Sequence, residues 1–76
     1  MSRLTLEQRD KLETAERELW RVLAHRRMGQ RHLMQPSLNR ATRFLRYAGF
    51  GGLAFQFEVA FVADERAEAR KQSEYA

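Results

Sequence analysis

The chain has 76 residues, no cysteine and a hydrophobic content of 43%. Its length predicts one small domain over residues 1–76, near the lower limit for a stable hydrophobic core. Without cysteine, the chain has neither disulfides nor cysteine-based zinc sites to reinforce that core. We therefore expect two copies to associate and to bury apolar surface that one copy leaves exposed.

The net charge of +4 is distributed unevenly. Residues 1–24 carry five basic and five acidic side chains, and residues 53–76 carry three basic and five acidic ones. Residues 25–52 carry six arginines, both histidines and no carboxylate. A segment of this kind indicates a basic surface for an acidic partner or for nucleic acid.

Residues 5–28 have the pattern of an amphipathic helix with defined ends. Thr5 and Gln8 have the spacing of a capping box, and Gly29 suits the left-handed position after a helix. Apolar residues recur at intervals of three and four, namely Leu12, Ala15, Leu19, Val22 and Leu23. We expect this stripe to face the core.

Residues 29–36 have the composition of a connection, and the second helix is predicted over residues 37–48 with Pro36 at its start. One side of this helix is apolar, with Leu38, Ala41, Leu45 and Ala48. The opposite side carries Asn39, Arg40, Arg43, Arg46 and Tyr47. Gly49 is expected to end it.

Residues 49–63 are the most apolar stretch and contain four of the five phenylalanines. If this stretch is a strand, its apolar and polar residues alternate between the two faces. If it is a helix, it has two apolar faces, one with Phe50, Leu53, Phe57, Ala60 and Phe61 and one with Phe55, Val59 and Val62. No other strand is predicted, so a strand would need a partner in a second copy. We therefore favour a long helix over residues 53–73 and keep the intermolecular strand as the alternative.

The predicted fold is all-α, a helical hairpin followed by a long C-terminal helix, in a homodimer. Leucines 12, 19, 23, 38 and 45 and the phenylalanine-rich face are expected to form the core. Residues expected in the apolar core or in self-association are Trp20, Phe50, Leu53, Phe57 and Phe61.

No residue pattern predicts catalysis, a cofactor or a metal site. The stretch GFGGLA follows a helical pattern and not the strand that a dinucleotide-binding turn requires. His25 and His32 have no neighbouring carboxylate to complete a ligand set. The chain begins without an apolar leader pattern and has no apolar run long enough to span a membrane, so we expect a cytoplasmic protein that is not an enzyme.

Two functions remain. The first is a small regulator, adaptor or inhibitor that binds a larger protein through its aromatic face and its arginines. The second is a helical nucleic-acid binder that grips phosphate without reading bases; base reading by a helix-turn-helix is disfavoured because residues 53–59 are mostly apolar. The residues expected to contact either partner are Arg26, Arg27, Arg31, Arg40, Arg43, Arg46 and Tyr47. Membrane insertion is disfavoured because the chain becomes acidic beyond residue 63.

Overall fold

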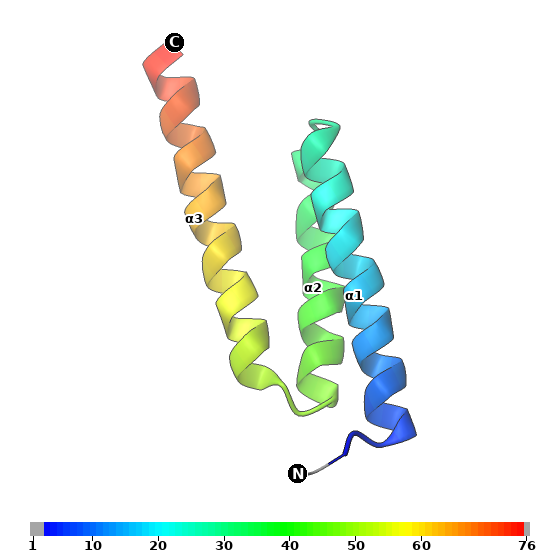
Figure 1. Ribbon diagram of the computed structural model, residues 1–76. Coiled ribbons are helices and arrows are strands. Elements are labelled where there is room, and N and C mark those ends of the chain that lie inside the picture. The colour runs from blue at the N-terminus through cyan, green and yellow to red at the C-terminus, as the bar shows by residue number, and fades with distance from the viewer. Residues whose placement is uncertain (1–2, 76) are drawn as a thin grey trace.

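The computed structural model describes residues 3–75, which contain helices and no strand (Figure 1). The elements are α1 (Leu6–Arg27), a short 3₁₀ helix η1 (Arg31–Leu33), α2 (Met34–Tyr47) and α3 (Gly51–Tyr75). α1 and α2 form an antiparallel hairpin, and α3 runs back from the far end of α2 (Figure 1). The prediction of an all-helical chain is confirmed, and the strand alternative for the phenylalanine-rich stretch is wrong.

Both ends of α1 are closed as the sequence predicts. The Thr5 hydroxyl accepts the Gln8 N–H, and the Gln8 side chain accepts the Thr5 N–H, each at 3.0 Å. After the helix, Gly29 is left-handed (φ +72°), and the Gln30 N–H donates to the His25 carbonyl at 2.8 Å. This pattern satisfies carbonyl groups that have no partner inside the helix.

α2 begins at Met34, earlier than predicted, and Pro36 lies inside its first turn. The N–H groups of a first turn have no acceptor within the helix, so a proline there removes no hydrogen bond. The earlier start makes Met34 part of the helix, where its side chain is buried. The connection between α1 and α2 is therefore shorter than residues 29–36.

α3 also begins earlier than predicted, at Gly51. Gly49 is left-handed (φ +92°), and the Phe50 N–H donates to the Leu45 carbonyl at 2.8 Å, which ends α2. Gly51 and Gly52 then form the first turn of α3 and do not interrupt the helix. Glycine destabilises a helix interior by about 1 kcal/mol, but few intrahelical bonds depend on the first turn.

The core is small and lies where the three helices meet. Ala15, Leu45 and Ala54 are buried at its centre, with Leu12, Phe44, Phe50 and Phe57 packed around them. Ala54 lets α3 lie close to α2 here, whereas Phe57 and Phe61 require more space further along α3. The ribbon of α3 accordingly diverges from the hairpin toward its C-terminus, which projects past the α1–α2 connection (Figure 1).

The divergence leaves much apolar surface uncovered. The radius of gyration is 14.5 Å, compared with about 11 Å for a compact domain of this length. Leu23, which the sequence places in the core, is 47% exposed because it lies at the open side between α1 and α3. Leu12 and Leu19 are half-buried, and Leu38 and Leu45 are buried as predicted.

Candidate functional site

Most of the arginines in the acid-free segment are paired with carboxylates of other helices. Four of the six form ion pairs, namely Arg26–Asp64 (3.0 Å), Arg31–Asp64 (2.7 Å), Arg31–Glu65 (2.5 Å), Arg40–Glu18 (3.1 Å) and Arg46–Glu58. The carboxylates that accept these pairs are nearest to the segment in sequence: Glu18 is the last one before it, and Glu58, Asp64 and Glu65 are the first three after it. The segment that is basic in sequence is therefore largely neutralised in space.

Asp64 is the centre of the largest of these clusters. It accepts hydrogen bonds from Arg26 at the end of α1 and from Arg31 in η1, across the gap where α3 has diverged from the hairpin. These two guanidinium groups, Arg26 foremost, hold the pKa of the Asp64 carboxyl below its usual range. The carboxylates of Asp64 and Glu65 likewise raise the pKa of Arg31. The cluster joins the middle of α3 to the end of α1 and to η1.

Glu18 links the two helices of the hairpin in a similar way. Its side chain is only 9% exposed, and its two oxygens accept Arg21 at 2.7 Å and Arg40 at 3.1 Å. Arg40 also donates to the buried Ser37 hydroxyl at 3.3 Å. A buried carboxylate of this kind requires its cationic partners to offset desolvation, so Arg40 has a structural function.

The remaining residues expected to bind a partner are Arg27, Arg43 and Tyr47, and all three are exposed. Within residues 3–75, neither Arg27 nor Arg43 forms an ion pair. The Tyr47 ring stands edge-on to Phe44, with centroids 6.1 Å apart. Residues three and four apart on a helix are neighbours, so Arg43 lies beside Arg46 on the solvent side of α2.

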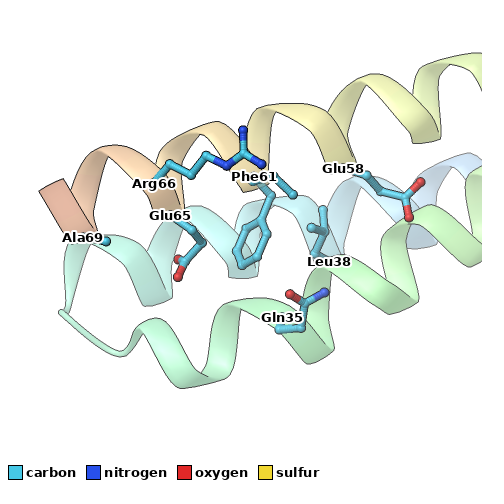
Figure 2. A pocket seen from close by; sticks show the side chains of 8 residues that line it. Gln35, Leu38, Glu58, Phe61, Glu65, Arg66 and Ala69 are labelled. Carbon is cyan, nitrogen blue, oxygen red and sulfur yellow. The ribbon is translucent and has the colours of Figure 1, made fainter.

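An open hollow of about 500 Å³ lies between α2 and α3. Figure 2 shows Phe61 projecting from α3 and Leu38 from α2 into this hollow, with Gln35 on the α2 side and Arg66 lying along α3. Its other lining residues are Glu58, Val62, Glu65 and Ala69. Its lining is mostly apolar and includes three charged side chains, Glu58, Glu65 and Arg66.

The apolar surface continues from this hollow onto the outer side of α3. Val62 lines both the hollow and a second depression of about 390 Å³ beside Phe55 and Val59. Phe55 is 63% exposed, Val59 52% and Val62 47%. We name the continuous surface formed by Leu38, Phe55, Val59, Phe61 and Val62 the α2–α3 face.

Sequence reasoning placed Phe61 among the apolar contact residues but did not select the other members of this face on α3. The signal was the spacing of Phe55, Val59 and Val62 at i, i+4 and i+7, a second apolar stripe on the same helix. A helix with two apolar stripes can bury only one of them against a hairpin. The other stripe remains available for a contact outside the chain.

The other predicted apolar contact residues lie elsewhere. Phe50 and Phe57 are half-buried against the core, whereas Trp20 and Leu53 are exposed. A smaller hollow of about 250 Å³ separates α1 from α3 on the other side of Phe61. It is lined mainly by apolar residues, and its charged residues, Arg26 and Asp64, pair with each other.

Within residues 3–75, no three histidine or carboxylate side chains converge as metal ligands would. The His25 Nδ1 atom lies 3.1 Å from the Gln30 side-chain oxygen. No helix among the described residues combines the length and the apolar character needed to span a membrane. Comparison with known protein families, curated proteins and solved structures finds no match.

Proposed function

We propose that this protein is a small non-enzymatic regulator, adaptor or inhibitor in the cytoplasm, which binds a larger protein through the α2–α3 face. The observation that supports the proposal is the exposure of Phe55, Val59 and Val62 in one stripe. Large contiguous apolar patches on a protein of this size are characteristic of interaction sites. Aromatic side chains in such patches commonly provide much of the binding energy.

The charges near this face favour binding over catalysis. Glu58 and Glu65, which line the α2–α3 hollow, are each paired with an arginine. The hollow is open, unlike the enclosed pockets that bind small substrates.

Co-purification from the cells that make the protein tests the proposal. Val59→Glu places a charge in the middle of the face at an exposed position, so the fold should survive, as a circular dichroism spectrum and thermal melt would verify. Leu6→Glu makes the same chemical change at a 77% exposed position of α1 and is the matched control. We expect a partner protein to be retained by the wild type and by Leu6→Glu and lost from Val59→Glu. Retention of the same proteins by all three would contradict the proposal.

Nucleic-acid binding is the alternative function and has less support. Arg40 and Arg46 are engaged with carboxylates of the same chain, which reduces the charge they offer to phosphate. Anisotropy of a labelled random duplex at about 50 and 200 mM salt tests this alternative, because phosphate contacts lose affinity steeply over that range. Tight binding at low salt that weakens in an Arg27/Arg43 double alanine variant, which keeps the ion pairs of Arg40 and Arg46, would favour nucleic acid.

The exposed apolar side chains could also form the interface of a homodimer. Trp20 and Leu53 are large apolar residues outside the α2–α3 face that a second copy would cover. We propose that any self-association uses these residues, and sedimentation of the wild type beside Trp20→Glu tests it. A dimer that dissociates in Trp20→Glu agrees with this proposal, whereas a monomeric wild type at about 100 μM would exclude it.

A further inference from the structure

We infer that the α2–α3 face binds an amphipathic helix of the partner protein, whose apolar stripe is flanked by aspartate or glutamate residues that pair with Arg43 and Arg66. This inference rests on the proposed function and specifies the chemistry of the partner. Three features of the face lead to it, namely its shape, the two arginines without an ion-pair partner in or beside it, and the net positive charge that they give it.

The shape of the face suits a helix. The hollow lies between two helices, and the stripe of Phe55, Val59 and Val62 runs along one side of it. Helices pack by placing the side-chain ridges of one into the grooves of another. An added helix would therefore lie in the α2–α3 groove and place apolar side chains beside Phe61 and Val62. Recognition of an amphipathic helix by an apolar groove is a common mode of binding.

Two arginines without an ion-pair partner lie in or beside the face. Arg66 lines both the hollow and the depression beside Phe55, whereas Arg43 lies beside Arg46 on the solvent side of α2 and lines neither of them. Neither Arg43 nor Arg66 has an ion-pair partner among residues 3–75. Glu58 is paired with Arg46, so it does not neutralise the two free arginines.

The net positive charge disfavours the other occupants. A second copy bound through the same face would place one basic surface against another, because a two-fold contact pairs a patch with itself. Nucleic acid would place phosphates over Phe55, Val59 and Val62, which offer no polar contact. An acidic amphipathic helix would contact both the apolar side chains and the two arginines without an ion-pair partner.

A peptide selection tests this inference. The probe is a phage-displayed library of helical peptides of about 20 residues with a fixed apolar stripe and randomised flanking positions. Peptides are selected for binding to the wild type and counter-selected against Val59→Glu. We expect the flanking positions to become enriched in aspartate and glutamate. A synthesised winner should bind with micromolar affinity, since one helix covers no more area than a weak, transient interface.

The charge pairing is then measured directly with that peptide. The double variant Arg43→Gln/Arg66→Gln should bind it about 5- to 10-fold more weakly, because each exposed ion pair changes affinity by a factor of a few. Arg17→Gln removes an exposed arginine of α1 and should leave the affinity unchanged. Equal affinity for the double variant and the wild type would overturn the inference.

The outcomes separate the inference from the proposed function. Enrichment of neutral or basic flanks would overturn the acidic helix and leave protein binding by the face intact. Failure to obtain any peptide sensitive to Val59→Glu would contradict both. A wild-type dimer that Val59→Glu converts to a monomer would assign the face to a second copy and also overturn the inference.

Discussion

Asp64→Asn should loosen α3 from the hairpin without changing the shape of any side chain. Asp64 accepts hydrogen bonds from Arg31 at 2.7 Å and from Arg26 at 3.0 Å. Its side chain is 29% exposed, that of Arg31 24% and that of Arg26 53%. Asparagine keeps the size and one acceptor oxygen but removes the charge that both arginines face.

The expected loss in the free energy of unfolding follows from these exposures. The half-exposed Arg26 pair contributes about 0.5 kcal/mol, in the middle of the range for surface ion pairs. The better buried Arg31 pair contributes about 1 kcal/mol, the upper end of the range for exposed pairs. The neutral amide retains part of this, so the net loss should be about 1 kcal/mol. For a domain of this size, that corresponds to a decrease in Tm of about 4–8 °C.

Thermal unfolding followed by circular dichroism at about 50 and 500 mM salt measures this loss. The difference between wild type and Asp64→Asn should decrease at high salt, because screening weakens the interaction that the variant lacks. Amide hydrogen exchange should also become faster in the C-terminal half of α3. Asp10→Asn makes the same change at an exposed position of α1 without an ion pair in residues 3–75 and should melt like the wild type. Identical melting of Asp64→Asn and Asp10→Asn would refute the proposed attachment of α3.

Three further predictions concern stability. Because the folded pKa of Asp64 is lowered, its contribution is present above its unfolded pKa and is lost as pH falls through the folded value. In acid titrations of stability, the difference between wild type and Asp64→Asn should therefore begin to shrink near pH ~4 and vanish only below the folded pKa. Glu18→Gln should lower the free energy of unfolding, measured by urea denaturation, by about 1–2 kcal/mol, because two charge-assisted hydrogen bonds lose their charged acceptor. The control Glu16→Gln changes an exposed residue and should have little effect. Equal effects of the two substitutions would contradict a structural role for Glu18. Gly49→Ala should lower Tm by about 4–8 °C, because the left-handed backbone at Gly49, and not a steric clash, disfavours alanine there. The control Gly51→Ala adds a methyl group in open space within a helix and should leave Tm unchanged or raise it. An unchanged Tm for Gly49→Ala would show that the turn tolerates a side chain.

The helix ends were predictable because they depend on neighbours in sequence. Thr5 and Gln8 are three residues apart, and Gly29 and Gly49 act on the helices directly before them. The sequence predicts later starts for α2 and α3 than the structure has, because proline and glycine commonly mark helix boundaries. Pro36 and Gly51 lie in first turns, where the backbone tolerates both residues.

The pairing of the arginines was not predictable from local sequence. Arg31 and Asp64 are 33 residues apart and meet only because α3 returns along the hairpin. A charge count along the chain shows a basic middle segment, but it does not show which carboxylates the fold brings to it. The second apolar stripe of α3 was visible in the sequence, yet which stripe faces inward depends on the close contact of Ala54 with the hairpin core.

Site-specific photo-crosslinking measures most directly whether the α2–α3 face binds a protein. A photoreactive residue would replace Val59 in the face or Arg17 on the exposed side of α1, in the cells that make the protein. We predict one discrete protein adduct at position 59, none at position 17, and loss of the adduct when Phe55→Ala is added. No adduct at position 59, or the same adducts at both positions, would contradict a function based on the α2–α3 face.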